Sequence, residues 1–164
     1  MGRVIKLLAT SKKTADGYYA MVAPFMLSQQ HPLYSVNDVF NAIFVHGNVL
    51  GDAMFYGSGA GKLPTASAVV ADIVDIAKHI HKNILISWSS KKLDLIDCKK
   101  AESRFFVRTT EDKDSVKAVF GEVEFIEVPE ITGETGFLTQ VMTEEDYEEK
   151  AGGLKNILQR IRVV

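Results

Sequence analysis

A glycine-rich connection between a predicted strand and a predicted helix is the feature that most constrains how this chain can fold. Gly57, Gly59 and Gly61 occupy alternate positions directly before a helical pattern. Glycine lets backbone N–H groups approach a ligand closely, and the N-terminus of the following helix attracts an anion. The run therefore predicts contact with a phosphate-bearing cofactor, although a simple tight turn is an equally open interpretation of the same residues.

Two familiar phosphate-binding motifs are excluded by the spacing of these glycines. The nucleoside-triphosphate loop requires four residues between its first glycine and its Gly-Lys pair, whereas three residues separate Gly57 from Gly61. The Rossmann fingerprint requires two residues before its third glycine, whereas one residue separates Gly59 from Gly61. The connection is therefore not a primary nucleotide-binding turn.

Apolar residues recur at intervals of three and four after the glycines and predict a helix from Pro64 to about His81. This apolar stripe comprises Ala66, Val69, Ile73, Ile76 and Ile80. Pro64 suits the first turn of a helix, where a missing N–H costs nothing. Ahead of the glycines, the runs Val39–Val45 and Val49–Tyr56 flank Gly47-Asn48 and predict a hairpin with its turn at those two residues.

The C-terminal part of the chain has the element order of a βαββαβ unit. The expected elements are strand Arg104–Thr109, helix Ser115–Phe120, strand Glu122–Val128, strand Gly136–Met142, a helix capped by Thr143 and strand Gln159–Val164. Such a unit buries one face of a sheet beneath two helices, as in ferredoxin-like folds. Together with a strand at Tyr19–Phe25, it predicts an α+β fold. Residues 83–101 show no clear period and are interpreted as a connector with one strand at Ile84–Ile86.

Composition narrows the classes of partner. The formal net charge is −2 and the lysines are scattered, whereas nucleic-acid binding needs a concentrated basic face. No apolar run reaches the roughly 18 residues that span a bilayer, and no signal-peptide pattern follows Met1. We therefore expect no nucleic-acid partner, no membrane association and a cytoplasmic location. Cys98 and the four histidines are interpreted as structural residues, so no metal site is expected.

Several spaced motifs in the first half of the chain resemble bacterial homoserine dehydrogenase. They are Val4–Ala9, His31-Pro32-Leu33, Val36–Val45, Gly47, Gly51, Met54–Gly61 and Leu63–Ile73. The motifs occur in the order that the family has. The resemblance implies that residues 1–82 form the C-terminal part of the catalytic domain, that residues 83–101 are a connector and that residues 102–164 form a separate module.

The resemblance also implies an activity, that of an NAD(P)-dependent oxidoreductase. Enzymes of this family interconvert L-homoserine and L-aspartate 4-semialdehyde in threonine and methionine biosynthesis. The resemblance places Gly61, with Gly59 and Thr65, beside the NAD(P) cofactor, on the side opposite the Rossmann turn. The family's Rossmann turn, catalytic lysine and homoserine-binding carboxylates lie upstream of the point that matches Met1. We therefore expect no catalytic residue, no tight NAD(P) binding and no dehydrogenase activity in this chain alone.

The module at residues 102–164 resembles an ACT domain, the regulatory module that many homoserine dehydrogenases carry. Arg104–Arg108 and Glu111–Lys113 match its first strand and the loop that follows. The chain departs from the pattern at Asp114-Ser115, where the family usually has Pro-Gly, so an amino-acid effector is implied while threonine binding is left open. Open strand edges and the hairpin at Val39–Tyr56 predict a homo-oligomer, a dimer or larger. The alternative is a stand-alone amino-acid-sensing or dimerisation module without catalysis.

Overall fold

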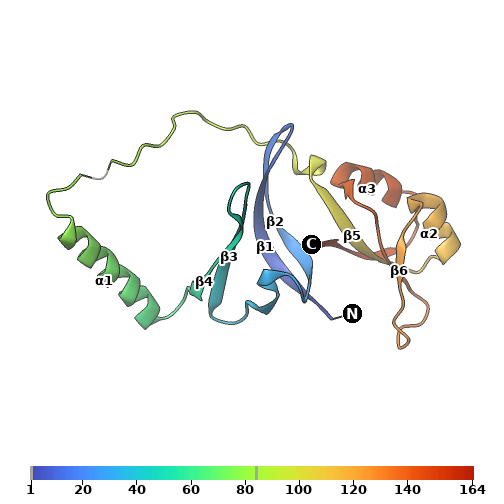
Figure 1. Cartoon of the computed structure of the whole chain (residues 1–164). Helices are drawn as coiled ribbons and strands as arrows, with labels where there is room; N and C mark the ends of the chain where they lie inside the picture. The colour runs from blue at the N-terminus through green and yellow to red at the C-terminus, as the bar shows by residue number, and fades with distance from the viewer. Residues whose placement is uncertain (1, 84) are drawn as a thin grey trace. The chain divides into compact units, whose positions relative to one another are not determined.

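The computed structural model describes residues 2–83 and 85–164, and its contacts group the chain into two compact units. One, which we call the sheet unit, comprises Met1–Ser28 and Leu93–Val164; the other, the glycine-loop unit, comprises Gln29–Lys92. Both contain strands, and helices accompany them, which confirms the predicted α+β class (Figure 1). The module boundaries predicted at residues 82 and 101 refer to the organisation of the family and stay a prediction.

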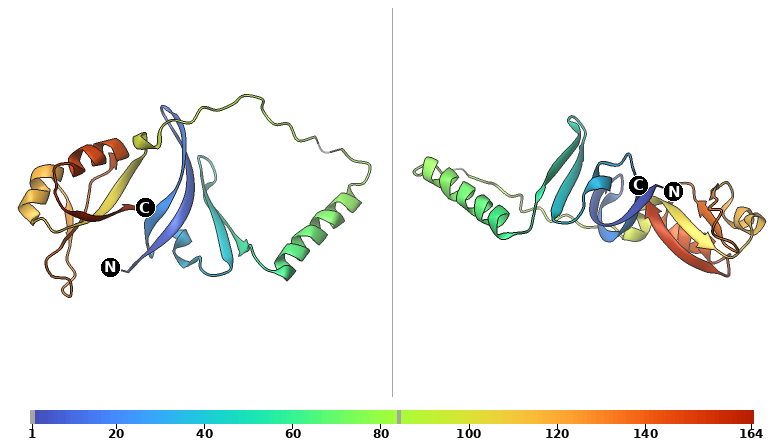
Figure 2. Two further views of the ribbon diagram at one scale, coloured as in Figure 1. Left: turned by 180° about the vertical axis from the view of Figure 1, so that it is seen from behind. Right: turned by 90° about the horizontal axis from the view of Figure 1, so that it is seen from below.

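Within the described residues, the sheet unit is built on one mixed sheet of seven strands. They are β1 (Arg3–Thr14), β2 (Gly17–Ser28), β5 (Glu102–Thr109), β6 (Glu124–Ile126), β7 (Thr135–Leu138), β8 (Met142–Thr143) and β9 (Ile157–Val163). Six of them follow the order β1-β2-β9-β5-β7-β6, and β8 pairs with β5 outside this path. Strand β2 runs parallel to β9, whereas the other neighbours are antiparallel. The N-terminal hairpin and the C-terminal strands therefore share one hydrogen-bonded layer (Figure 2).

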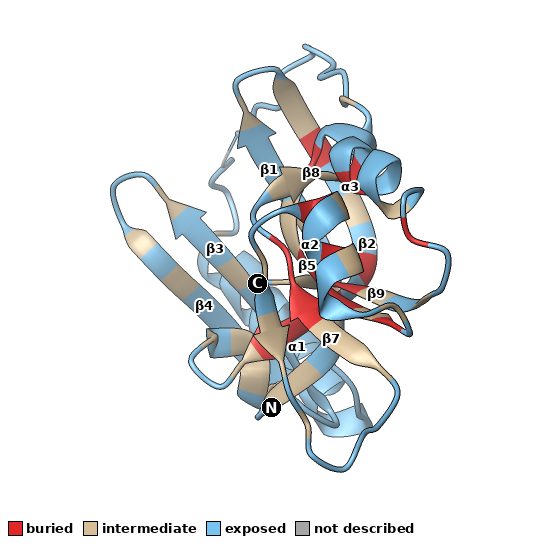
Figure 3. Cartoon of the chain, turned by 90° about the vertical axis from the view of Figure 1, so that its right-hand side faces the viewer, coloured by how far each residue is buried: buried red, intermediate tan, exposed pale blue. Residues whose placement is uncertain are grey.

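Two helices cover one face of the C-terminal strands (Figure 3). They are α2 (Lys113–Phe120) and α3 (Glu144–Ala151). Phe105 and Val107 of β5 and Phe137 of β7 are fully buried beneath them, in one cluster with Val116 and Tyr147. Phe105 and Val107 lie in the same layer because alternate residues of a strand point to the same face. Each fully buried side chain of this size contributes about 1.5–3 kcal/mol, so this cluster is the main core of the unit.

The opposite face of the same strands carries a second apolar cluster. It consists of Met26 of β2 with Phe106, Leu138 and Ile161 of β5, β7 and β9. The backbone N–H of Val164 also donates to the carbonyl of Met26, at 3.1 Å. Side-chain packing and backbone pairing therefore fasten the N-terminal hairpin to the C-terminal strands at the same place.

The structure divides one of the predicted C-terminal strands into two at a single residue. A single strand was expected over Gly136–Met142, whereas the structure has β7 and β8 with Thr139 between them. The Thr139 hydroxyl accepts a hydrogen bond from the Phe105 N–H at 3.0 Å, while the Thr139 N–H donates to the Phe105 carbonyl at 2.9 Å. A side-chain oxygen thus replaces a backbone carbonyl and interrupts the ladder. The predicted cap of α3 is confirmed, because the Thr143 hydroxyl accepts from the Asp146 N–H at 3.0 Å.

The glycine-loop unit contains a hairpin followed by a long helix. Its elements are a short 3-10 turn (Pro32–Ser35), β3 (Phe40–Gly47), β4 (Gly51–Ser58) and α1 (Lys62–Lys78). The predicted hairpin is confirmed, but its turn is not at Gly47-Asn48. Gly47 pairs with Gly51, so the loop is formed by residues 48–50, and Gly51 rather than Gly47 has a positive φ, 74°. Three-residue hairpin loops of this kind place a glycine in the left-handed region at their end.

The predicted connector has little regular structure. The strand expected at Ile84–Ile86 begins at Ile84, which lies outside the described residues, and Leu85 and Ile86 belong to no strand. That prediction is wrong for these two residues, because a strand needs a partner and none pairs with them in the described chain. Nearer the sheet, a 3-10 turn (Cys98–Lys100) leads into β5. None of the helices in the described ranges combines the length and apolar character needed to cross a membrane.

A charged cluster lies at the edge of the helix-covered core. The buried carboxylate of Glu144 accepts a hydrogen bond from Arg162 at 2.5 Å and lies 3.1 Å from Nη1 of Arg160. The Arg160 guanidinium also lies over the ring of Tyr147, 4.9 Å from its centroid. The Tyr147 hydroxyl is buried without a hydrogen-bond partner among the described residues. Burial raises the pKa of Tyr147 to about 12, although the positive charge of Arg160 opposes the shift.

Replacing Tyr147 by phenylalanine tests this buried hydroxyl. Because the folded-state pKa is raised, the neutral hydroxyl contributes stability that is present below pH 10 and is lost as the pH rises toward 12. We expect the free energy of unfolding of the wild-type chain to fall by about 2 kcal/mol more than that of Y147F across this range. At neutral pH the variant should be at least as stable, because it buries no unpaired polar group. Urea unfolding followed by circular dichroism measures both quantities, and identical pH profiles would contradict the assignment.

Candidate functional site

The connection between β4 and α1 is the candidate cofactor site. Gly61 immediately precedes α1 with φ 118° and ψ 152°, a backbone conformation that residues with a side chain rarely adopt. A Cβ built at this position would lie 3.3 Å from Cδ of Pro64. The backbone conformation alone therefore explains a glycine here.

Backbone N–H groups at the start of α1 are available to an anion. Among the described residues no side chain caps this end of the helix, and Pro64 in its first turn has no N–H. The first helical hydrogen bond runs from the Thr65 N–H to the Gly61 carbonyl, at 3.2 Å. Within the part of the chain that the structure describes, the N–H groups of Gly61, Lys62 and Leu63 make no hydrogen bond, as expected for a helix N-terminus.

The charge at this helix end also suits an anion. Lys62 is the first residue of α1, and the first turn contains no acidic residue. Its ammonium adds to the positive end of the helix dipole. Free N–H groups, a cation and the missing side chain at Gly61 together fit the phosphate groups of the predicted NAD(P) cofactor. Lys62 was not among the predicted site residues, although its position directly after Gly61 was the signal that could have identified it.

Gly59 has a different reason for being a glycine. Its N–H donates to the carbonyl of Val39 at 3.3 Å, so this amide is already used within the unit. A Cβ at position 59 would lie 1.9 Å from Nδ2 of Asn41. A side chain at position 59 would therefore require the Asn41 side chain to move, and the Gly59 backbone N–H has no free hydrogen for a cofactor.

Thr65 lies exposed in the first turn of α1. Because its N–H is bonded to Gly61, only its hydroxyl remains to contact a ligand. The structure thus brings Gly61 and Thr65 to one helix end, with Lys62 beside them. The cofactor contact predicted for Gly59, Gly61 and Thr65 stays a prediction.

The apolar stripe of α1 is exposed over its whole length. Val69, Ile73 and Ile76 are between 53% and 67% exposed, and no residue of the helix is buried. A helix with an apolar face of this size normally buries it against another element. The helix therefore presents a surface that suits a further packing partner.

The loop between β5 and α2, where the ACT-like resemblance places an effector, is closed by the chain itself. The Asp112 carboxylate accepts a hydrogen bond from the Ser115 N–H at 2.7 Å and caps α2. Hydrogen bonding from the Ser115 backbone, and then from the Ser115 side chain, lowers the pKa of Asp112, and the backbone N–H of Asp114 acts in the same direction. A ligand carboxylate at this helix end would have to displace Asp112.

His31 and His46 contact residues close to them in the sequence, whereas Cys98 contacts a distant strand. Nδ1 of His31 accepts from the Leu33 N–H at 3.2 Å, and burial lowers the pKa of His31. His46 pairs with Asp52 across the β3–β4 hairpin at 2.5 Å. The Cys98 thiol donates to the carbonyl of Ala20, at 3.2 Å. Across residues 2–83 and 85–164, no group of three side chains suited to a metal ion comes together.

Comparison with known proteins identifies relatives that match from about half to three quarters of the chain. A family model described as homoserine dehydrogenase matches residues 1–74. A homoserine dehydrogenase of Lactococcus lactis is 49% identical over 77 residues, which are 47% of this chain and 18% of that protein. One from Helicobacter pylori is 35% identical over 125 residues, or 76% of this chain and 29% of that protein. The matched regions thus span less than a third of each relative.

Solved structures match almost the whole chain. A homoserine dehydrogenase from Thiobacillus denitrificans superposes with a TM-score of 0.77 and 22% identity, over 99% of this chain and 43% of that chain. A homoserine dehydrogenase of S. aureus superposes with a TM-score of 0.67 and 27% identity, over 99% of this chain and 42% of that chain. The first of these superpositions shows a shared fold alone, and that fold includes the C-terminal strands and helices.

Proposed function

Because this chain belongs to the homoserine dehydrogenase family over residues 1–74, we propose that it forms the C-terminal part of an NAD(P)-dependent homoserine dehydrogenase. The intact enzyme interconverts L-homoserine and L-aspartate 4-semialdehyde, a step toward threonine and methionine. The observation that carries the proposal is the 49% identity over 77 residues. The family match includes the glycine connection and the first turns of α1. The cytoplasmic location expected from the sequence is part of the same proposal.

In the intact enzyme, the residues of this chain bind and orient the cofactor. NAD(P), when bound, accepts or donates the hydride. With the cofactor bound, the N–H groups of Lys62 and Leu63 would donate to a phosphate oxygen, and the Lys62 ammonium would neutralise part of its charge. Gly61 would leave room for the phosphate group, and the Thr65 hydroxyl would be the remaining donor at this helix end. Gly59 supports this end indirectly, because its N–H bonds to the carbonyl of Val39, the residue directly before β3.

The exposed apolar stripe of α1 supports a place within a larger enzyme. Burial of a Val or Ile side chain contributes about 1.5–3 kcal/mol, so a helix that exposes several of them is stabilised by a covering partner. In the proposed enzyme that partner is the dinucleotide-binding domain. The superposition on 43% of the length of a solved homoserine dehydrogenase agrees with this view.

A complementation assay tests the proposed activity. The purified 164-residue chain should show no homoserine-dependent reduction of NAD(P), since the family's catalytic lysine and Rossmann turn have no match in it. Joined in frame behind the N-terminal part of a related homoserine dehydrogenase, in place of that protein's own C-terminal part, it should restore the reaction. Activity of the isolated chain, or a well-folded chimera without activity, would refute the assignment.

Gly61→Val in the active chimera tests the cofactor contact. The valine side chain would occupy the space that a phosphate group needs, and the positive φ adds strain of about 1–3 kcal/mol. We expect the KM for NAD(P) to rise at least about tenfold, while a strain of this size lowers the melting temperature by only several degrees. Gly57→Val is the matched control, because a Cβ at Gly57 meets no atom within 4 Å. If both variants keep the original KM, Gly61 is only a turn residue.

We further propose that residues 102–164 form an ACT-like regulatory module. The element order β5-α2-β6-β7-α3-β9 and the strand order β9-β5-β7-β6 support it. The other candidate function is a stand-alone amino-acid-sensing or dimerisation module without catalysis. Genomic sequence in frame ahead of Met1 separates the two, since a glycine-rich Rossmann segment there favours the enzyme.

The chain is also proposed to assemble as a dimer or larger homo-oligomer. Ile43 and Phe55 on the β3–β4 hairpin are 66% and 68% exposed, and a two-stranded hairpin with open apolar faces is stabilised by a partner. Light scattering at tens of micromolar should therefore give a mass of at least twice 18.1 kDa. A measured mass that stays at the monomer value would refute the proposal.

A further inference from the structure

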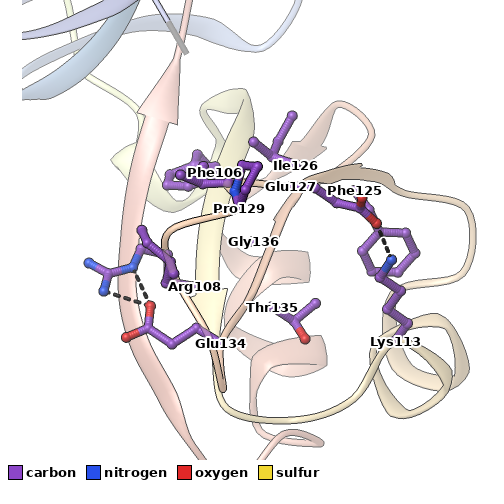
Figure 4. Close-up of a pocket in the computed structure, with 12 residues that line it drawn as sticks. Phe106, Arg108, Lys113, Phe125, Ile126, Glu127, Pro129, Glu134, Thr135 and Gly136 are labelled. Carbon is purple, nitrogen blue, oxygen red and sulfur yellow. Dashed lines mark hydrogen bonds and ion pairs between the residues drawn. The ribbon is translucent and has the colours of Figure 1, made fainter.

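A cavity of about 600 Å³ lies within the C-terminal segment, which we define as residues 93–164 (Figure 4). It opens where the edge strand β6 ends and the loop of residues 127–134 turns back toward β7, and Phe106 of β5 forms part of its wall. Its size is in the range of pockets that hold small molecules, so it is a second candidate site in this chain. The helix-covered cluster around Phe105 and Phe137 belongs to the same segment. The C-terminal segment therefore has a core of its own.

The last strand of this segment contacts the N-terminal hairpin through both backbone and side chains. Strand β2 runs parallel to β9 at Phe25 and Met26, and both residues are only 6% exposed. Met26 packs in the apolar cluster whose other buried members all belong to the C-terminal segment. The burial of Met26 therefore depends on a part of the chain that is far away in the sequence.

A second contact with the hairpin lies just ahead of β5. Leu95 forms a bridge with Tyr18, and the Ile96 N–H donates to the Tyr18 carbonyl at 2.8 Å. The Cys98 thiol donates to the carbonyl of Ala20, at 3.2 Å. The returning chain is therefore held against the hairpin from Leu95 onward.

The connector between α1 and this second contact is not held in the same way. Residues 83 and 85–92 belong to no helix or strand, and in the described chain they make no backbone–backbone hydrogen bond. Their side chains are exposed, and that of Trp88 is 88% exposed. The Lys91 N–H donates to the Ser89 hydroxyl at 3.1 Å, which is a contact within the connector itself. Exposed segments with so few hydrogen bonds are the preferred sites of proteolytic cleavage.

From the exposed connector and the two contacts beyond it, we propose that the Lys91-Lys92 pair is a site of proteolytic cleavage and that the cut chain persists as a two-piece protein. A protease specific for basic residues adds water across the amide that follows Lys91 or Lys92. The C–N bond breaks, a carboxylate forms on the lysine, and an ammonium forms at the new N-terminus. Both contacts with the hairpin lie outside the cut, so the C-terminal segment stays bound to β2 without a covalent link.

The proposal gives the N-terminal hairpin a partner of defined chemistry. That partner is a strand that runs parallel to β2 and belongs to a segment whose apolar cluster covers Met26. The inference goes beyond the dehydrogenase role proposed above and does not rest on it, because it concerns only contacts within residues 1–28 and 93–164.

Limited trypsin digestion of the full 164-residue chain tests the proposal. Mass spectrometry should show the first cut after Lys91 or Lys92, and the N-terminal piece can be followed by its fluorescence because Trp88 is the single tryptophan. At about 10 µM on a native size-exclusion column, both pieces should elute together at the position of the uncut chain, as expected for a Kd below about 1 µM. In concentrated urea they should separate. A first cut at any other bond, or separate elution in native buffer, overturns the proposal.

Substitution of the two lysines tests the site of the cut. In the double variant with Lys91→Gln and Lys92→Gln, the first cut should be at least about tenfold slower, because local unfolding must expose another site. Lys13→Gln is the matched control, since Lys13 is exposed but pairs with Tyr18 inside the hairpin, and it should leave the rate unchanged. An unchanged rate in the folded double variant overturns the site.

Met26→Asp tests what holds the two pieces together. A carboxylate in this apolar cluster has no partner there, so the pieces of the cut variant should separate in native buffer. Val22→Asp is the matched control on the same strand, because Val22 is 68% exposed, and its pieces should stay together. Should Met26→Asp fail to fold before it is cut, Met26→Ala replaces it and should raise the Kd of the pieces at least about tenfold. Unchanged association in a folded Met26 variant overturns the role of this contact.

Discussion

The alternation of side chains along β5 is the constraint on which the sheet unit depends. Phe105 and Val107 enter the core beneath the helices, while Phe106 enters the cluster on the opposite face. A register slip of one residue would exchange the two faces and direct Arg108 toward the helix-covered core, where a charge without a partner is costly. The register of β5 therefore fixes both clusters, and with them the wall of the cavity and the contact with Met26.

Continuity of the sheet is the second consequence of this arrangement. Residues 1–28 lie in the part of the chain that matches the family model, yet they share a sheet with the C-terminal strands. Beyond the β2–β9 pairing, the Ile96 N–H donates to the carbonyl of Tyr18 at 2.8 Å, which holds the returning chain beside the hairpin. A module joined in this way cannot be treated as a flexible appendage, because its last strand is a neighbour of β2.

Local patterns in the sequence predicted most of the elements, and long-range contacts account for what they missed. Periodicity located α1, and the spacing of Thr143 and Asp146 predicted the cap of α3. The pairing of β2 with β9 leaves no local pattern, because it joins opposite ends of the chain. Gly59 and Gly61 looked equivalent in the sequence, yet one is explained by the approach of Asn41 and the other by a positive φ. The cavity could not be predicted, since its lining residues come together only when the loop folds back on the sheet.

The two candidate sites differ in how much of a binding site one chain supplies. At the start of α1 the chain offers N–H groups, an ammonium and an exposed hydroxyl, all from one short segment. Pockets usually bury more than about 70% of a bound small molecule, so a cofactor held there needs a second wall from outside residues 57–65. The cavity beside β6 draws its lining from three strands, a loop and α2 of a single unit. The site at the start of α1 is therefore expected to bind its cofactor only within the intact enzyme, whereas the cavity beside β6 is complete in this chain. Either site can prove wrong without affecting the other.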